Sequence, residues 1–149
     1  MRLTLHTDYS LRVLMFAALK GDGLSTIGEI AEHFEISRTH LMKVVNDLGR
    51  AGYLETVRGK KGGFRLAKKP RAVKIGAVVR DLEDELGVVG CMQQANYCAI
   101  EGACVLRRAL GEATAAFLAV LDRYTLDDLV RPRKSLVRLL DLGGLPQVF

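Results

Sequence analysis

Cysteine is scarce in this sequence, tryptophan is absent, and aromatic residues make up only 6% of the chain. The three cysteines are too few, and odd in number, for the disulfide framework of a small exported domain. Long apolar runs are also missing, because stretches such as Leu11 to Leu19 fall well short of the roughly 18 residues that a membrane span requires. The N-terminus has no basic region leading into a cleavable apolar segment. We therefore expect a cytoplasmic protein with no membrane partner.

The motifs of common enzyme classes are missing as well. The sequence has no Cys-x-x-Cys pair, no phosphate-binding glycine loop and no convincing set of acid and base residues. These gaps argue against an enzyme, for example a thiol oxidoreductase, and we predict no catalytic residues.

The chain does have ample apolar content and an uneven distribution of charge. Apolar residues make up 49% of the 149 residues, which is enough for a packed core. The net charge is +5, and the segment from Leu54 to Lys74 holds eight basic residues against Glu55 alone. This concentration of positive charge predicts a polyanion as the partner.

The N-terminal third has the spacing of a helix-turn-helix. A scaffold helix is predicted from about Asp8 to Lys20, ended by Gly21-Asp22-Gly23. Thr26 and Glu29 fit a capping box at the start of a second helix, and a short turn at Glu35-Ile36 follows it. Ser37 then caps a third helix, whose apolar residues recur at helical spacing: Leu41, Val44, Val45 and Leu48. Its other face carries hydrogen-bonding side chains, as a recognition helix does: Thr39, His40, Lys43, Asn46 and Arg50.

A basic hairpin comes directly after this third helix. Residues 53–57 predict a strand, residues 58–63 a glycine-rich turn and residues 64–67 a returning strand. A hairpin in this position is a wing, so the sequence predicts a winged helix-turn-helix that binds double-stranded DNA. The alternative is a solvated basic hairpin on a protein-interaction module. The candidate DNA contacts are Ser37, Arg38, Thr39, His40, Lys43, Arg58, Lys60, Lys61 and Arg65.

The second half of the chain predicts further helices around a loop. A fourth helix is expected from Val73 to Leu86, and we interpret its acidic run as a solvated face: Asp81, Glu83, Asp84 and Glu85. An irregular loop is predicted from Gly87 to Ala103. A long helix then has the spacing of a coiled-coil seam and needs a partner: Leu106, Leu110, Ala113, Phe117, Val120 and Tyr124. Another helical patch is expected over 136–142, and we expect the tail from Gly143 to Pro146 to be mobile.

All of the cysteines lie near this loop. Cys91, Cys98 and Cys104 are separated by six and then five residues, wider than the spacing usual for structural zinc. Thiolates anchor iron-sulfur clusters, usually four at a time, so three cysteines leave one iron needing another ligand or open to a small molecule. Zinc, a metal-free thiol switch and three buried thiols are the alternatives.

These features predict a mainly α fold, with a winged helix-turn-helix, a two-stranded wing and a long dimerisation helix. We divide the chain into a DNA-binding domain (1–70), a connecting helix (71–90), a cluster-binding loop (91–104), a dimerisation helix (105–125) and a C-terminal helix with a mobile tail (126–149).

The chain resembles the Rrf2 family of winged-helix regulators over nearly its whole length, up to about Asp141. The resemblance lies in Met1-Arg2-Leu3-Thr4 followed by Asp8-Tyr9, in residues 36–41, in residues 57–64 and in the cysteine triplet. Within the family the chain is most similar to the nitric-oxide-sensing repressors. This resemblance implies a homodimer whose iron-sulfur cluster, [4Fe-4S] in preference to [2Fe-2S], controls binding to a palindromic operator.

The same resemblance implies a fourth cluster ligand. Members of that branch use an acidic residue from the first helix of the other subunit, which maps onto Asp8. The residues alone do not rank Asp8 above His6 or Glu101. The alternative is that Asp8 is only a helix-start residue, favoured there by the helix dipole. Related regulators of cluster assembly use a histidine three positions after the last cysteine, where this chain has Arg107.

The hypothesis is therefore that nitric oxide attacks the cluster iron, breaks the bridge between subunits and releases the DNA. One rival is a regulator of the same architecture that answers iron or oxidative stress through a [2Fe-2S] centre. Another is a scaffold protein without a cluster.

Overall fold

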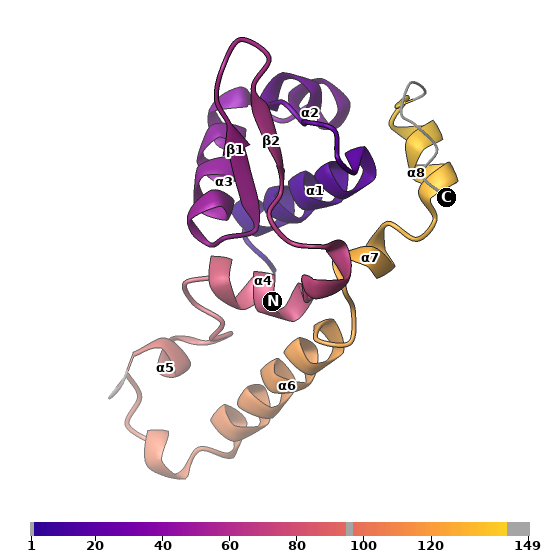
Figure 1. The fold of residues 1–149 in the computed structure, drawn as a ribbon. Helices are drawn as coiled ribbons and strands as arrows, with labels where there is room; N and C mark the ends of the chain where they lie inside the picture. Colours follow the sequence, from indigo (N-terminus) through magenta and orange to yellow (C-terminus); the bar gives the residue numbers. More distant parts are fainter. Residues whose placement is uncertain (1, 95–96, 143–149) are drawn as a thin grey trace.

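The computed structural model describes residues 2–94 and 97–142. Its N-terminal part contains three helices followed by an antiparallel hairpin: α1 (Leu5–Lys20), α2 (Ile27–Phe34), α3 (Arg38–Arg50), β1 (Leu54–Val57) and β2 (Gly63–Leu66). Figure 1 shows the hairpin rising beside α3, with α1 and α2 behind it. This arrangement confirms the predicted mainly helical fold with a winged helix-turn-helix.

The helix starts follow the predicted capping chemistry. Thr26 Oγ1 accepts a hydrogen bond from Glu29 N at 3.3 Å, and Thr26 N donates to Glu29 Oε2 at 2.9 Å, which completes a capping box. Ser37 Oγ accepts from His40 N at 3.3 Å and so caps α3. Between the two helices Glu35 adopts a left-handed conformation with φ 54°, which makes the turn tight.

The core of this part forms where α1 crosses α2 and α3. Phe16, Ile30, Leu41 and Leu48 are fully buried there. The hairpin joins the same core through Phe64, whose backbone forms two hydrogen bonds with the backbone of Ser25, at 2.8 and 2.9 Å. The exposed face of α3 is therefore held on a rigid body together with the base of the hairpin.

The first helix begins earlier than the predicted start at Asp8. Thr4 caps it, because Thr4 Oγ1 accepts a hydrogen bond from Thr7 N at 3.2 Å. Asp8 consequently lies inside the first helical turn, where the helix dipole favours a negative charge.

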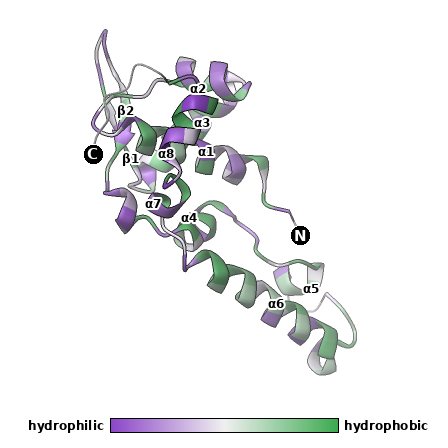
Figure 2. Ribbon diagram, turned by 90° about the vertical axis from the view of Figure 1, so that its right-hand side faces the viewer, coloured by the Kyte–Doolittle hydropathy of each residue, from purple (hydrophilic) through white to green (hydrophobic). Residues whose placement is uncertain are grey.

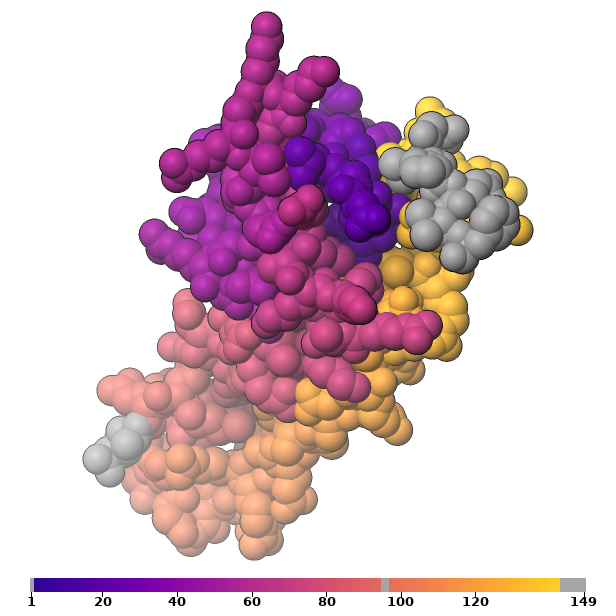
Figure 3. Space-filling model, in the orientation of Figure 1, coloured from indigo at the N-terminus to yellow at the C-terminus, as the bar shows by residue number. Residues whose placement is uncertain are grey.

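The C-terminal part consists of shorter elements and one long helix: η1 (Pro70–Ala72), α4 (Ile75–Leu82), α5 (Gly90–Gln93), η2 (Glu101–Ala103), α6 (Val105–Leu121), α7 (Leu126–Leu129) and α8 (Arg133–Leu139). We call residues 90–94 and 97–121, which contain α5, η2 and α6, the arm. Figures 1 and 3 show the arm projecting away from the winged helix, whereas α7 and α8 return to its side. In the part of the chain that is described, no helix is both long and apolar enough to cross a membrane.

The fourth helix ends at Leu82, so the prediction that it extends to Leu86 was wrong. Glu83 beyond it accepts hydrogen bonds from Thr4 N at 2.8 Å and from Thr4 Oγ1 at 3.0 Å. Asp81, inside the helix, accepts a hydrogen bond from the hydroxyl of Tyr53. The acidic run is therefore not one solvated helix face, because two of its members bind the winged helix.

Other boundaries also differ from the prediction. The segment from Gly87 to Ala103 contains the short helices α5 and η2. The long helix ends at Leu121, and α7, capped by Thr125 and Asp128, was not predicted. The predicted mobile tail, Gly143 to Pro146, lies outside the described residues.

Candidate DNA-binding surface and cysteine loop

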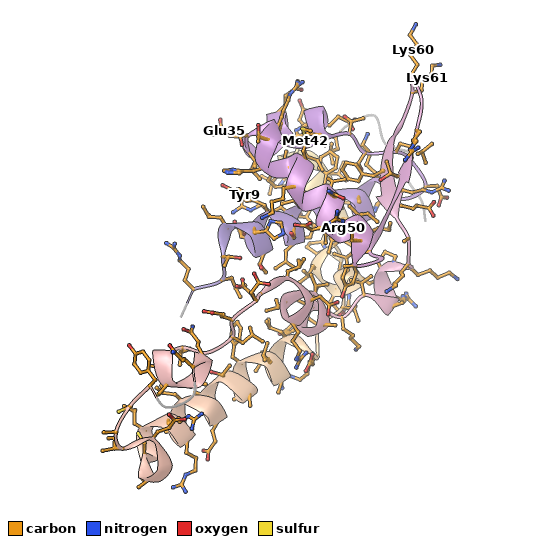
Figure 4. The ribbon with its side chains drawn as sticks, turned by 90° about the vertical axis from the view of Figure 1, so that its left-hand side faces the viewer. Tyr9, Glu35, Met42, Arg50, Lys60 and Lys61 are labelled. Carbon is orange, nitrogen blue, oxygen red and sulfur yellow. The ribbon has the colours of Figure 1, made fainter. Side chains whose placement is uncertain are left out.

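One face of α3 is exposed and rich in side chains that form hydrogen bonds. The predicted contacts at the start of this helix are all exposed: Ser37, Arg38, Thr39, His40 and Lys43. The opposite face buries Leu41, Val44 and Leu48 in the core, which fixes the rotation of the helix about its axis. Figure 4 looks onto α3, with Met42 and Arg50 along it.

The wing, residues 54–66, carries a second group of exposed cations. Arg58, Lys60 and Lys61 are exposed, and Figure 4 shows both lysines at the tip of the hairpin. Gly59 has φ 125°, and a Cβ at Gly62 would lie 2.4 Å from the carbonyl oxygen of Val57, so the turn requires glycine at both positions. The tip of the hairpin is therefore a tight turn, and its cations point into solvent from that turn.

Arg65 is placed differently from the other cations of the wing. It stands opposite Glu55 in the register of the two strands, and its guanidinium pairs with the Glu55 carboxylate. A cross-strand ion pair of this kind orders the hairpin. Among the predicted wing contacts, Arg65 is thus the one already engaged by a carboxylate.

The start of α1 contacts the recognition helix directly. His6 Nε2 lies 3.3 Å from Asp47 Oδ2, near the C-terminal end of α3. The rings of Tyr9 and His40 lie with their centroids 6.1 Å apart. Asp8 lies between His6 and Tyr9 in the sequence. A displacement of this helical turn would therefore change the contacts that His6 and Tyr9 make with α3.

Three exposed residues of α3 were not among the predicted contacts: Met42, Asn46 and Arg50. Met42 is 61% exposed, and Asn46 lies one turn further along the same face. Their spacing of four residues from Arg38 to Met42 to Asn46 was the available signal. Met42 was overlooked because an apolar residue in an amphipathic helix is normally assigned to the core.

The three cysteines lie along the arm. Cys91 is half-buried in α5, Cys98 is exposed, and Cys104 is half-buried at the start of α6. Cys104 Sγ accepts a hydrogen bond from Arg107 N at 3.4 Å, and the thiol thereby caps α6. All three thiols are free.

The donor chemistry of the arm fits an iron-sulfur cluster, because three free thiols on one segment are the ligand type that such clusters take. Within residues 2–94 and 97–142, however, no three histidine, cysteine or acidic side chains stand close enough together to hold one metal ion. The segment between Cys91 and Cys104 would have to close around a cluster.

A cavity of about 560 Å³ lies beside Cys104, lined also by Glu101, Arg107 and Gly111. Arg107 Nη1 lies 2.8 Å from Glu101 Oε1, whereas Glu101 Oε2 is buried without a hydrogen-bond partner among the described residues. Arg107 is therefore held in an ion pair with Glu101 beside Cys104.

Asp8 is separated from these cysteines within one subunit. It lies on α1, in the winged helix, whereas the cysteines lie on the arm (Figure 1). Its carboxylate accepts two hydrogen bonds from Arg12, at 2.8 and 3.3 Å. A cluster ligand role for Asp8 thus requires a second subunit.

Comparisons with known proteins agree with this architecture. The family model Rrf2, described as an iron-dependent transcriptional regulator, matches residues 3–132. A Bacillus subtilis (strain 168) protein named HTH-type transcriptional regulator NsrR is 49% identical over 144 residues, which cover 95% of this chain and 99% of that protein. A Geobacillus kaustophilus (strain HTA426) protein of the same name is 51% identical over 142 residues, covering 94% and 97%.

Solved structures show the same fold. CymR (YrzC), described as the global cysteine regulator of B. subtilis, has a TM-score of 0.67 at 26% identity and covers 88% of this chain and 97% of its own. IscR of T. potens has a TM-score of 0.70 at 23% identity, with 99% and 94% covered. The matched family and the named relatives are transcriptional regulators, which confirms the prediction that the chain is not an enzyme.

Proposed function

Because this chain belongs to the Rrf2 family of transcriptional regulators, we propose that it is a DNA-binding repressor that senses nitric oxide through an iron-sulfur cluster. The observation that carries the proposal is the set of three free thiols on one segment leading into α6, in a chain about half identical to proteins named NsrR. Sensor and DNA-binding surface then lie in different parts of one chain.

The DNA contacts divide between two surfaces. The exposed residues at the start of α3 would meet base edges in the major groove, whereas the cations of the wing would bind phosphates beside it. Lys60 and Lys61 at the tip have no carboxylate partner within 4.0 Å among the described residues, so they are available for phosphate oxygens. Arg65 would contribute less, because Glu55 neutralises it.

The cluster would be held by Cys91, Cys98 and Cys104, with Asp8 of the partner subunit as the fourth ligand. Three thiolates and one carboxylate provide one ligand for each iron of a [4Fe-4S] cluster, which favours this type over [2Fe-2S]. When bound, the cluster supplies iron that can react with nitric oxide.

The arm provides the surface for a homodimer. Along α6 the predicted seam is largely exposed in one subunit, with Leu106 at 65%, Val120 at 42% and Tyr124, just beyond the helix, at 47%. Thr114 and Leu118 face the helix's own subunit instead. Figure 2 shows mostly hydrophobic residues along α6. An exposed apolar stripe of this length indicates a protein interface, and a second copy would bring Asp8 to the partner's cysteines.

The residues of α1 and α3 provide the coupling. Asp8 is held by Arg12 in the single subunit. Binding at the partner's loop would weaken this pair and shift the first turn of α1. That turn carries His6 against Asp47 and Tyr9 against His40, so the recognition helix is displaced in turn. A hundredfold change in operator affinity requires only about 2.7 kcal/mol of coupling.

Replacement of Cys98 tests the proposal. Cys98 is exposed, so Cys98→Ala should leave folding and dimerisation unchanged while operator affinity falls. Ala99→Gly, at the neighbouring position, is the matched control and should retain both the cluster and operator affinity. Equal affinity of Cys98→Ala and the wild type would contradict the sensor role. A [2Fe-2S] spectrum with a response to iron or peroxide instead of nitric oxide would favour the rival regulator of the same architecture.

A further inference from the structure

Met42 is the apolar residue in the middle of the exposed face of α3. Its side chain is 61% exposed, although the helix buries Leu41, Val44 and Leu48 on the other side. Helical spacing places Arg38 four residues before Met42 and Asn46 four residues after it on the same face. Met42 is thus surrounded by the polar groups that would meet DNA.

The fold does not need methionine at this position. A singly exposed apolar residue is common on protein surfaces and by itself indicates nothing. Here, however, the residue lies on the helix face that the proposed function buries against DNA, and Figure 4 shows Met42 on the outward side of α3. Its side chain would therefore lose its solvent contact only when DNA is bound.

We propose that Met42 is a specificity-determining residue that contacts the C5-methyl group of a thymine in the major groove. Thymine is the base that presents an apolar group there, so an apolar side chain among hydrogen-bonding ones distinguishes it from the other bases. Methionine suits the contact because its unbranched thioether adapts to the local shape of a surface. This inference rests on the proposed DNA binding through α3.

The test removes the methyl group from the DNA. Duplexes are first selected from a random library with the anaerobically purified full-length protein, and each thymine of the selected site is then replaced by deoxyuridine. We expect the wild type to lose affinity by about fourfold at one position in each half-site, the effect of one buried apolar carbon. Met42→Ala should bind the unmodified duplex more weakly and should be insensitive to that replacement.

Two variants serve as controls. Met42→Leu, which keeps an apolar side chain of similar volume, should retain the sensitivity to deoxyuridine. Leu139→Ala removes an apolar side chain that is 77% exposed on α8 and should behave like the wild type. Equal sensitivity of Met42→Ala and the wild type, or no sensitive thymine at all, would overturn the inference while leaving the repressor function intact. Failure to select any duplex would overturn both.

Discussion

Arg12 donates two hydrogen bonds to the carboxylate of Asp8, from Nη2 to Oδ2 at 2.8 Å and from Nε to Oδ1 at 3.3 Å. The two residues are one helical turn apart on α1, and both side chains are 43% exposed. The carboxylate that is proposed to bind iron in the partner subunit is therefore occupied by a cation within its own subunit. We propose that Arg12 competes with the cluster for Asp8.

We therefore expect Arg12→Gln to retain the cluster longer than the wild type. An exposed ion pair at this spacing contributes about 0.3 to 0.5 kcal/mol, so the spontaneous decay of the visible cluster absorption should slow by about twofold. The decay is measured under argon with a chelator present. Rapid loss of the cluster, as expected for Asp8→Ala, would contradict competition and indicate that Arg12 supports the ligand.

The lysines at the tip of the wing should bind phosphates. Replacing both Lys60 and Lys61 by alanine should weaken binding to all duplexes and reduce the slope of log affinity against log salt by about 2, or about 0.9 per phosphate contact. Fluorescence anisotropy at several salt concentrations measures the slope. Lys134→Ala removes one exposed lysine on α8, outside the wing, and should leave the slope unchanged. An unaltered slope for the double variant would remove the wing from the interface.

The contact between His6 and Asp47 should transmit the state of the cluster to α3. Replacing either residue with alanine should reduce the ratio of operator affinities with and without cluster by about fivefold, or about 1 kcal/mol, the lower end of the coupling free energies usual between two sites. The double variant should show no larger effect than the single variants, since both act through one contact. His6→Gln, which still carries a donor, should retain most of the ratio. Additive effects, or a changed cluster spectrum, would contradict a transmitting role.

Tyr53 links the base of the wing to α4 through its hydrogen bond to Asp81. Burial, together with this hydrogen bond, raises the pKa of Tyr53 well above its ordinary value. Tyr53→Phe should lower the free energy of unfolding by about 1.5 kcal/mol at pH 7, measured by urea denaturation.

The raised pKa of Tyr53 also gives this difference a pH dependence. Above about pH 10 the unfolded wild-type chain loses the phenol proton, whereas the folded protein keeps it, so the contribution of Tyr53 decreases as the pH rises. The gap between the wild type and Tyr53→Phe should therefore narrow in that range. A gap that is constant from pH 8 to pH 11 would contradict the assignment.

The elements that follow local chemistry could be predicted from the sequence. The capping box of Thr26 and Glu29 and the cap at Ser37 depend on residues within one helical turn, and the structure has both. The end of α4 could not be predicted, because Glu83 is held by Thr4, which is 79 residues away in the chain. The spacing of the apolar residues alone predicted that the helix would extend to Leu86.

The residue types of the candidate site could be predicted from the sequence, but the ion pairs that these residues form could not. The spacing of residues in α3 correctly separated the buried side from the exposed side. That Arg65 is neutralised by Glu55, and that Asp8 is held by Arg12, depends on side-chain positions that no spacing rule specifies. Met42 was missed for a different reason, because residue type was given more weight than its place on the helix.

The most direct test of the central claim is a titration of the anaerobically purified protein with nitric oxide, in which the visible sulfur-to-iron absorption and the binding of an operator fragment are followed in the same samples. The account predicts that the absorption bleaches and the DNA is released over the same range of nitric oxide. Release without bleaching, bleaching without release, or no cluster absorption at all would contradict it.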